Sequence, residues 1–342
     1  TMPRALSFGS VNIDEFYFVP HIAVPGQTVS SSRRATLAGG KGANQAVALA
    51  KAGVDAYAGG KIGTDGVWVR DGMRDMGVHV ELLLMDHDTP TGRAVIQSSE
   101  QDGENAIILY GGTNRTVDEA EVMAVLDGSG QHQRVEPFGA GDWLLLQNEM
   151  SAAGHALAMA KKREMITLLN PAPMSDALLA EYDLRLVDIC IVNETEASHL
   201  LRLLDDAPDT ASSPSDLVER LFSRFANLSG VIVTLGAEGV VAQFNTATPG
   251  ADQPAAAETI RLPACPIKEK VVDTTGAGDT FIGYLVAGLI AEGWRPHSPL
   301  PRATIESVLC RASMASALAI QRHGAMESIP TREQVDSALA AL

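Results

Sequence analysis

Short hydrophobic runs alternate along the chain with longer segments in which apolar residues recur at helical spacing. The short runs predict buried strands, which we place at Ala5–Phe8, Ala56–Ile62, Trp143–Gln147, Met165–Leu169, Ile189–Val192, Val231–Leu235 and Val240–Phe244. The longer segments predict helices at Ala43–Ala52, Asp118–Leu126, Ala152–Lys162, Glu194–Leu204, Ala277–Ala291 and Ile305–Arg322. Such alternation is typical of an α/β protein in which helices cover both faces of a mostly parallel sheet.

Two stretches depart from this alternation. Residues 13–37 are rich in β-forming residues without helical period, and residues 92–110 alternate between apolar and polar positions around a turn at Gln101-Asp102-Gly103. Because consecutive strands without connecting helices do not fit a parallel sheet, we expect a small antiparallel flap that projects from the main body. The sequence leaves open whether this flap moves or is a fixed extension of the sheet edge.

Composition narrows the class of protein and of partner. The 342 residues carry 42 acidic and 26 basic side chains, a net charge of −16, and 46% of them are hydrophobic. A chain of this length can bury a large core without metals or disulfides. Because the acidic excess repels phosphate backbones and anionic lipids, we expect neither nucleic acid nor a membrane as a partner. An anionic ligand in a locally basic or dipolar pocket stays compatible with this charge.

The cysteines and the N-terminal residues indicate the compartment. Cys190, Cys265 and Cys310 are an odd number with wide spacing and no CxxC motif, which argues against a disulfide framework and a zinc site. The first residues soon turn polar, so we expect no secretory leader, and no apolar run reaches the length of a membrane helix. We therefore expect a cytoplasmic protein.

The segment from Asp273 to Phe281 carries the strongest signal for chemistry. Gly276 and Gly278 let a ligand approach the backbone, and the helix predicted to begin here directs free N–H groups and its positive dipole end to the same place. Asp279 stands in the first turn of that helix. A carboxylate beside an anion site suits the removal of a proton from a hydroxyl that attacks a phosphoryl group. The alternative, that Asp279 only caps the helix, explains the short motif about as well.

Residues 138–142 include the same tetrapeptide, Gly-Ala-Gly-Asp, and provide an internal comparison. They precede a predicted strand, so no helix supplies N–H groups and a dipole at this position. We predict a plain turn there.

A second glycine cluster, residues 39–45, also opens a helix but matches neither a Walker A loop nor a dinucleotide fingerprint. Lys41 and Asn44 can present donors beside the glycines to a polyhydroxylated ligand or its phosphate, although a tight turn alone explains the glycines equally well. Asn12 and Asp14 lie two residues apart on an extended stretch, so their side chains share a face. They suit a grip on a sugar diol or, alternatively, a solvated strand face.

The order of several motifs resembles that of the ribokinase-like family of carbohydrate and nucleoside kinases, over nearly the whole chain. These motifs are Gly9-Ser10-Val11-Asn12-Ile13-Asp14, Pro25-Gly26-Gln27-Thr28-Val29, Gly39-Gly40-Lys41-Gly42-Ala43-Asn44-Gln45-Ala46, Asn170-Pro171-Ala172-Pro173, Asn193-Glu194-Thr195-Glu196-Ala197, Thr234-Leu235-Gly236 and the segment from Asp273 to Phe281. Their combination is most similar to the members that act on ribose. The resemblance implies one three-layer α/β/α domain over residues 1–342, with a mostly parallel central sheet and a discontinuous β lid formed by about 13–37 and 92–110.

The resemblance further implies ATP-dependent phosphorylation of D-ribose to D-ribose 5-phosphate. It makes Asp279 the base that takes the proton of the ribose 5-hydroxyl, while Gly276, Ala277 and Gly278 hold the charge that develops on the transferred phosphoryl group. The sugar-binding positions that it implies are Asn12, Asp14, Gly40, Lys41, Gly42, Asn44, Glu149 and Asp279. Glu149 follows the predicted strand Trp143–Gln147, at the carboxyl edge where α/β sheets bind ligands.

For ATP and its metals the resemblance implies two further groups of residues. The nucleotide-binding positions are Asn193, Glu196, Thr234, Gly236, Gly239 and Gly278, of which Asn193 and Glu196 hold Mg²⁺ through water. The positions for an activating monovalent cation, K⁺, are Asp273, Thr275, Ala319, Arg322, Gly324 and Ser328, several of them through backbone carbonyls. Asn193 with Glu196 also fits a plain helix cap, and both roles are compatible.

The resemblance also implies that the flap covers the sugar and pairs with a second subunit in a homodimer. The chain departs from the family pattern in three stretches that resemble insertions, around residues 128–141, 205–215 and 246–258. Ser313 stands where the family often has Asn or His near the adenine, so the base contacts stay unassigned. Glu327 adds a charge next to a proposed cation ligand.

Three rival functions fit parts of the sequence. The nearest is another kinase of the same family, acting on fructose, deoxyribose or adenosine, because a single hydroxyl changes binding by a modest free energy. A silent sugar-binding regulator is the second, and the intact Asp279 with its two glycines counts against it. NAD-dependent oxidation requires a Gly-x-Gly-x-x-Gly turn after the first strand, which Phe8-Gly9-Ser10-Val11 does not supply.

Overall fold

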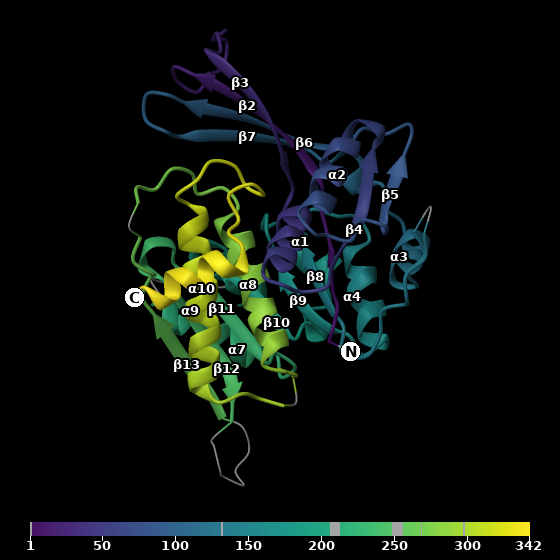
Figure 1. Ribbon diagram of the computed structural model, residues 1–342, viewed down its shortest axis with the longest axis vertical. Helices are drawn as coiled ribbons and strands as arrows, with labels where there is room; N and C mark the ends of the chain where they lie inside the picture. Colours follow the sequence, from purple (N-terminus) through teal and green to yellow (C-terminus); the bar gives the residue numbers. More distant parts are fainter. Residues whose placement is uncertain (1, 131–132, 206–212, 248–255, 268, 297) are drawn as a thin grey trace.

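The computed structural model describes residues 2–130, 133–205, 213–247, 256–267, 269–296 and 298–342, and its body is built on a nine-stranded sheet (Figure 1). The strands lie in the order β13-β12-β11-β10-β9-β8-β1-β4-β5. Their bounds are β1 (Ala5–Phe8), β4 (Ala56–Gly63), β5 (Leu83–Asp86), β8 (Trp143–Gln147), β9 (Ile166–Asn170), β10 (Ile189–Asn193), β11 (Gly230–Thr234), β12 (Val240–Thr246) and β13 (Ala256–Leu262). Among the strand pairs of this sheet that the structure describes, only β11–β12 and β12–β13 are antiparallel, so the predicted mostly parallel sheet is confirmed.

Helices cover both faces of this sheet and complete three layers. One face carries α1 (Lys41–Lys51), α2 (Val67–Asp75), α8 (Ala277–Ala291), α9 (Arg302–Ala319) and α10 (Arg332–Ala340). The other face carries α3 (Glu119–Leu126), α4 (Ala153–Lys162), α5 (Leu178–Glu181), α6 (Glu194–Asp205) and α7 (Pro214–Arg224). None of the described helices is both long and apolar enough to cross a membrane.

The sheet has a separate hydrophobic core on each face. In β8, Leu145 enters the core under α1 and α8, while its neighbours Leu144 and Leu146 enter the core under α4. Successive side chains of a strand point to opposite faces, so a strand buried on both sides must be apolar at every position. This is why the strands were predictable as unbroken hydrophobic runs.

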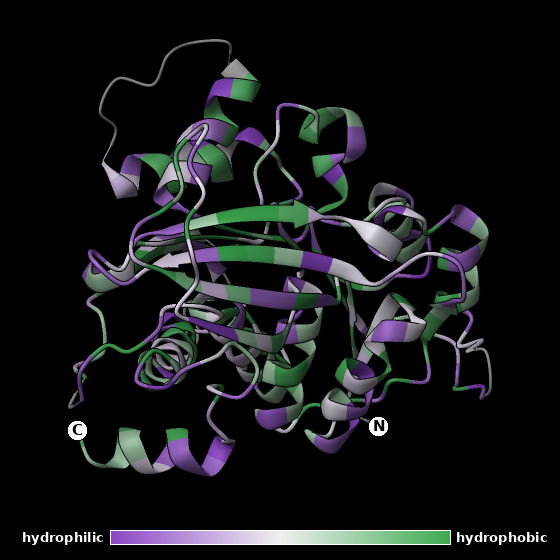
Figure 2. Cartoon of the chain, turned by 90° about the horizontal axis from the view of Figure 1, so that it is seen from above, coloured by the Kyte–Doolittle hydropathy of each residue, from purple (hydrophilic) through white to green (hydrophobic). Residues whose placement is uncertain are grey.

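Four strands from two separate stretches form a second, smaller sheet beyond the body (Figure 1). In the order β3-β2-β6-β7, they are β3 (Arg33–Gly39), β2 (Asn12–Val19), β6 (Gly92–Ser99) and β7 (Asn105–Tyr110). Seen from above, these strands lie across the body (Figure 2). The expected purely antiparallel arrangement is wrong at the centre, because β2 and β6 pair parallel. Both strands start at the body, where Asn12 pairs with Gly92, and both run outward.

The three stretches that resemble insertions are only partly described. In the stretch 128–141, residues 131–132 lie outside the described residues. In the stretches 205–215 and 246–258, residues 206–212 and 248–255 lie outside them. Residues 138–142 form a turn and no helix follows it, as predicted. The Asp142 carboxylate accepts a hydrogen bond from the Gly139 amide at 3.2 Å and forms an ion pair with Arg4 at 2.6 Å.

Candidate active site

The residues predicted to bind the sugar and to act as the base lie where the carboxyl ends of β1 and β8 face the N-terminal ends of α1 and α8. The strand order reverses at this pair of strands, since β4 and β5 follow on one side of β1 and β9 to β13 follow on the other side of β8. Open α/β sheets bind ligands in the crevice at such a switch point. The fold therefore places the candidate residues at the position that its topology favours for a ligand.

Asp279 lies in the first turn of α8 and is 7% exposed. The cap of this helix is Gly276, in the left-handed conformation with φ 75°, so the alternative role of Asp279 as the cap is wrong. Two consecutive residues of α1 bind the carboxylate, the Nδ2 of Asn44 at 2.9 Å from Oδ2 and the Nε2 of Gln45 at 3.0 Å from Oδ1. The two glycine-rich helix starts predicted from the sequence thus meet at one carboxylate.

The ammonium group of Lys41 opposes the negative charge of the carboxylates around Asp279. Burial raises the pKa of Asp279, while the positive charge of Lys41 and the bonds from Asn44 and Gln45 act to lower that pKa. Burial would lower the pKa of Lys41, but the negative charges that include Asp279, Glu149 and Glu196 outweigh it and raise that pKa. Lys41 is therefore held in its charged form between both halves of the site.

Asp14 and Glu149 form the acidic side of the crevice. Burial, together with the charges of Glu149 and Asp279, raises the pKa of Asp14 to about 7. Burial also raises the pKa of Glu149, opposed by Lys41 and by a short hydrogen bond from the Ser10 hydroxyl. Asn12 and Asp14 are 6% and 8% exposed, so the alternative of a solvated strand face is wrong.

Glycines of the second cluster make room for these side chains. A Cβ atom on Gly39 would stand 2.0 Å from Asp14 Oδ2, and one on Gly42 would stand 2.4 Å from the carbonyl carbon of Gly9. Gly40 caps α1 with φ 96°, a conformation that favours glycine. Gly278 differs, because its backbone is exposed and no atom lies within 4 Å of an added Cβ. The start of α8 is thus open to a ligand.

Asn114, which was not predicted from the sequence, fixes the orientation of Asn12. The Nδ2 of Asn114 donates to Asn12 Oδ1 at 2.8 Å, and the Oδ1 of Asn114 accepts from the Val11 amide at 3.1 Å. Asn114 belongs to the short turn η2 (Gly112–Arg115) and is 2% exposed. Glycines beside an Asn indicate a turn, but a partner about a hundred residues away leaves no local signal.

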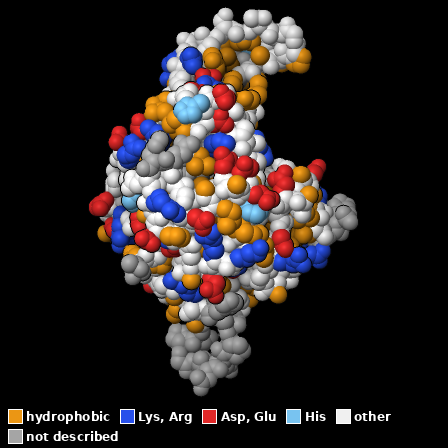
Figure 3. Space-filling view, turned by 90° about the vertical axis from the view of Figure 1, so that its right-hand side faces the viewer, with side chains coloured by type: hydrophobic (Ala, Val, Ile, Leu, Met, Phe, Trp, Pro, Cys, Tyr) orange, Lys and Arg blue, Asp and Glu red, His pale blue; other side chains and the backbone are white. Residues whose placement is uncertain are grey.

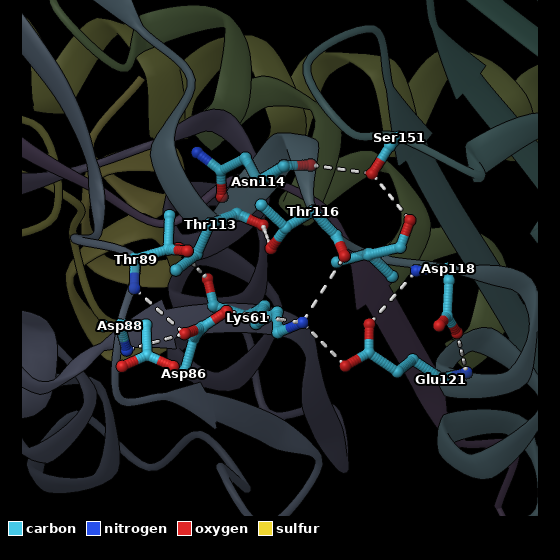
Figure 4. A network of polar contacts seen from close by, with 12 residues as sticks. Lys61, Asp86, Asp88, Thr89, Thr113, Asn114, Thr116, Asp118, Glu121 and Ser151 are labelled. Atoms are coloured by element: carbon cyan, nitrogen blue, oxygen red, sulfur yellow. Dashed lines mark hydrogen bonds and ion pairs between the residues drawn. The ribbon is translucent and has the colours of Figure 1, made fainter.

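Figure 4 shows how this turn is fixed to the body. The Thr113 hydroxyl donates to the Lys61 carbonyl at 2.8 Å, and the Ser151 hydroxyl donates to the Asn114 carbonyl at 3.3 Å. The Lys61 ammonium reaches the Glu121 carboxylate of α3 at 2.7 Å. Asn12 is therefore oriented by a turn that hydrogen bonds attach to the body.

The predicted nucleotide residues lie at the ends of neighbouring strands. Asn193 and Thr234 are paired, as the last residues of β10 and β11. Asn193 and Glu196 cap α6 reciprocally, with bonds of 2.8 and 2.9 Å, so the predicted cap is present. After β11, Gly236 and Gly239 have φ 55° and 100°, and a Cβ on Gly239 would stand 2.1 Å from the Leu262 carbonyl oxygen. These glycines shape the loop between β11 and β12.

Asp273 joins the two segments predicted to hold a monovalent cation. Its carboxylate accepts from the Thr275 amide at 2.9 Å and from the Gly324 amide at 3.1 Å. Burial acts to raise the pKa of Asp273, but these bonds outweigh it and lower the pKa. The Ala319 carbonyl accepts from the Arg322 amide at 3.1 Å, and the Ser328 hydroxyl donates to the Ala325 carbonyl at 2.8 Å. A carboxylate beside turns rich in carbonyls is the hard oxygen donor set that suits K⁺.

Within the described residues, no group of three or more His, Cys, Asp or Glu side chains is arranged to hold a metal ion. Asn193 is exposed and Glu196 is half-buried, so their oxygens suit a hydrated ion rather than a closed cage of side chains.

The sequence is similar to carbohydrate kinases over almost its whole length. The profile described as pfkB family carbohydrate kinase matches residues 2–332. The ribokinase of Staphylococcus aureus is 32% identical over 339 residues, which cover 97% of this chain and 98% of that protein. The bifunctional ribokinase/ribose-5-phosphate isomerase A of Fructilactobacillus sanfranciscensis is 32% identical over 337 residues, covering 98% of this chain. The chain spans 56% of the length of that bifunctional relative.

Solved structures share the fold. The ribokinase of Cryptococcus neoformans var. grubii in complex with ADP has a TM-score of 0.78 and 35% identity, with 98% of this chain and 99% of that chain covered. The ribokinase of Arabidopsis thaliana complexed with ribose and ATP has a TM-score of 0.75 and 27% identity, with 99% of each chain covered. The three-layer fold expected from the sequence is confirmed.

Proposed function

The chain belongs to the pfkB family of carbohydrate kinases, and on this premise we propose that it transfers the terminal phosphate of ATP to the 5-hydroxyl of D-ribose, giving D-ribose 5-phosphate and ADP. Relatives named ribokinase support the proposal, as does the related structure complexed with ribose and ATP. The observation that carries the chemistry is the buried Asp279 carboxylate at the open start of α8, bound by Asn44 of α1.

Asp279 is the general base of this proposal. It accepts the proton of the sugar hydroxyl while the hydroxyl oxygen forms its bond to the terminal phosphorus of ATP and the bond to the leaving ADP oxygen breaks. The positive end of α8, at Gly276, Ala277 and Gly278, stabilises the charge on the transferred phosphoryl group. The Lys41 charge and the bonds from Asn44 and Gln45 favour the ionised form of the base against the effect of its burial.

The sugar lies among Asn12, Asp14, Gly40, Lys41, Gly42, Asn44 and Glu149 in this proposal. Because Asn114 donates to the Oδ1 of Asn12, the Nδ2 of Asn12 is left to donate to a sugar hydroxyl. The Oδ1 of Asn44 is buried and has no hydrogen-bond partner within the described part of the chain, so it suits a hydroxyl donor. Carboxylates and amides on one crevice wall match a ligand with several vicinal hydroxyls.

For the nucleotide we assign Asn193, Glu196, Thr234, Gly236, Gly239 and Gly278. Asn193 and Glu196 would hold Mg²⁺ through water, and the ion when bound would neutralise charge on the phosphates. The influence of Glu196 on the pKa of Lys41 indicates that this end of the site is within electrostatic range of the sugar end.

We assign Asp273, Thr275, Ala319, Arg322, Gly324 and Ser328 to an activating K⁺. The ion would hold the two loops together and add positive charge beside the start of α8. Glu327 adds negative charge in the same loop, and this charge contributes to the raised pKa of Asp14.

We further infer that the small sheet is a lid over the sugar and the contact surface of a homodimer. Four consecutive residues of its edge strand β7 are exposed, Ile107, Ile108, Leu109 and Tyr110, by 58, 64, 51 and 52%. Figure 3 shows the small sheet as a projection with hydrophobic side chains on its surface. An apolar edge strand exposed on both faces is a surface that another chain covers. The three free cysteines agree with a reducing, cytoplasmic location.

The test is a coupled assay of ADP release with ribose, deoxyribose, fructose and adenosine, with and without K⁺. We expect turnover with ribose, activation by K⁺, and a fall in kcat of about 10³-fold or more in Asp279→Asn with sugar affinity largely kept. Equal turnover by Asp279→Asn would remove the base. Preference for fructose, deoxyribose or adenosine would assign the chain to a different activity of the same family.

A further inference from the structure

Two buried glutamines connect the Asp279 carboxylate to the central strand β8. Besides the Gln45 bond to Asp279 at 3.0 Å, the Nε2 of Gln147 donates to the Oε1 of Gln45 at 2.7 Å. We propose that Gln45 and Gln147 are positioning residues, which hold the Asp279 carboxylate in one orientation toward the substrate hydroxyl and supply it with a donor. The inference rests on the proposed function, in which Asp279 is the base.

The direction of this chain of hydrogen bonds is set by the carboxylate. An ionised carboxylate only accepts, so Gln45 must turn its amide nitrogen to Asp279 and its oxygen away. That oxygen in turn requires a donor, and Gln147 must present its nitrogen. The remaining oxygen of Gln147 is buried with no hydrogen-bond partner in the described ranges, which is the cost of this orientation. An amide pair that served packing alone would not require this arrangement.

Gln147, at the far end of this series of hydrogen bonds, is held by the backbone and by its neighbours. Gln147 is the last residue of β8, and its carbonyl accepts from the hydroxyl of the buried Tyr182 at 2.8 Å. A Cβ on Gly9 would stand 1.8 Å from the Gln147 side-chain oxygen, so the glycine after β1 leaves the space that this side chain occupies. Both glutamine side chains are 0% exposed. The orientation of the base is therefore tied to two central strands.

Other charges also act on Asp279 and must stay unchanged in a test. They come from Lys41 at the start of α1, Asp14 on β2 and Glu149 after β8. A useful variant therefore removes the amide donor without adding charge. Gln45→Met and Gln147→Met keep the length of the side chain and remove the donor. Gln243→Met, in the half-buried Gln243 of β12, is the matched control.

The decisive measurement is the pH dependence of kcat. The base must be ionised to act, and a donated hydrogen bond favours the ionised form. Loss of the Gln45 donor is expected to move the acid limb of the profile to higher pH by about one unit, with kcat about tenfold lower below that limb. Gln147→Met is expected to move the acid limb in the same direction by a smaller amount. Gln243→Met is expected to leave the acid limb where it is. The KM for ATP is expected to stay unchanged in each variant.

A second readout works without turnover. Titration of the Asp279 carboxyl carbon by NMR in ¹³C-labelled protein, assigned through its loss in Asp279→Asn, is expected to show the same upward shift in Gln45→Met. If native protein forms ADP but neither the profile nor the titration moves in folded Gln45→Met, the positioning role is overturned and the proposed function stands. If no sugar is phosphorylated but the titration moves, the proposed function fails while the hydrogen-bonded link to Asp279 stands. Should Gln45→Met not fold, Gln147→Met decides by the same criteria.

Discussion

Asp14, a proposed sugar ligand, lowers the stability of the folded protein at neutral pH. Its pKa rises from the ordinary 3.8 to about 7 because it is buried beside other carboxylates. The folded protein therefore binds a proton on Asp14 that the unfolded chain has already lost between about pH 4 and pH 7. Stability contributed at this residue falls as pH rises through that window, the opposite of a salt-bridged carboxylate.

Replacement of Asp14 by Asn is expected to stabilise the protein above pH 7 and to weaken ribose binding. Each pKa unit corresponds to about 1.4 kcal/mol, so the free energy of unfolding at pH 8 is expected to rise by roughly 2–4 kcal/mol, and by much less at pH 5. Denaturant unfolding at both pH values measures this difference. An equal gain at both pH values would contradict the assigned charge state, and Asn12→Asp serves as the opposite change at the same crevice wall.

Gly278 and Gly42 are glycines for different reasons, the first because it leaves space for a ligand and the second because it packs against backbone. Nothing lies within 4 Å of a Cβ on Gly278, whereas one on Gly42 would meet the Gly9 backbone. We expect Gly278→Ala to keep the thermal midpoint within about 2 °C while kcat/KM for ATP falls about 10–100-fold, because the methyl group enters the ligand space.

Gly42→Ala is the contrasting variant and is expected to lose about 1–3 kcal/mol of stability, because backbone must move. Calorimetry and steady-state kinetics on both proteins provide the comparison. A large loss of stability in Gly278→Ala with normal kinetics would show that its role is structural.

At the scale of elements, the contact of α1 with α8 sets the distance between Asp279 and its two amide donors, Asn44 and Gln45. Gly283 of α8 lies against α1 so closely that a Cβ would stand 2.3 Å from the Ala48 side chain and 2.9 Å from its backbone. This contact lies one helical turn from Asp279. The packing of two helices therefore controls the geometry of the proposed chemistry.

Gly283→Ala is expected to push α8 away from α1, lowering the free energy of unfolding by about 1–3 kcal/mol and kcat by at least tenfold. Gly72→Ala in α2 is the matched control, because nothing lies within 4 Å of its Cβ, and we expect its kinetics to be unchanged. Unfolding curves and kcat values of the two variants measure how far this contact controls stability and turnover. Normal kcat in Gly283→Ala would show that α8 tolerates the displacement.

Element boundaries show where the sequence pattern ceases to be informative. Helix α1 begins at Lys41, after its cap Gly40, two residues before the predicted start. The prediction began too late because the first turn is polar and gives no apolar periodicity. Helix α9 begins at Arg302, directly after Pro301, where proline suits the helix start. β5, β13, α2, α5, α7 and α10 were not predicted, because short or amphipathic edge elements give weak periodic signals.

At the scale of the whole molecule, the exposed strand β7 predicts a dimer. Ile108, 64% exposed, pairs with Val95 of β6, and β7 is the outermost of the four strands that the structure describes in the small sheet. Ile108→Lys is expected to convert a dimer into a monomer in sedimentation or light-scattering experiments, because a charge is costly in an apolar contact. Trp68→Lys, at a side chain 45% exposed on α2, is the control and is expected to leave the dimer intact. A native chain that sediments as a monomer would contradict the lid contact.

The sequence by itself determined the layered architecture and the two glycine-rich helix starts. Both are local signals: a strand buried on both faces must be apolar throughout, and a helix start that opens on glycine needs no distant partner to be recognised. The central strands β1 and β8 and the helix α8 were predicted with the bounds that the structure has.

Only the tertiary structure decided what those local features do together. It brought Asn44 and Gln45 onto Asp279, more than two hundred residues away in the chain, and it placed Gln147 and Asn114 behind them. It also made β2 and β6 parallel, which no alternation of residues within either strand could indicate. Charge states, hydrogen-bond directions and strand pairing depend on groups that are close in space and distant in sequence, so a pattern read along the chain does not contain them.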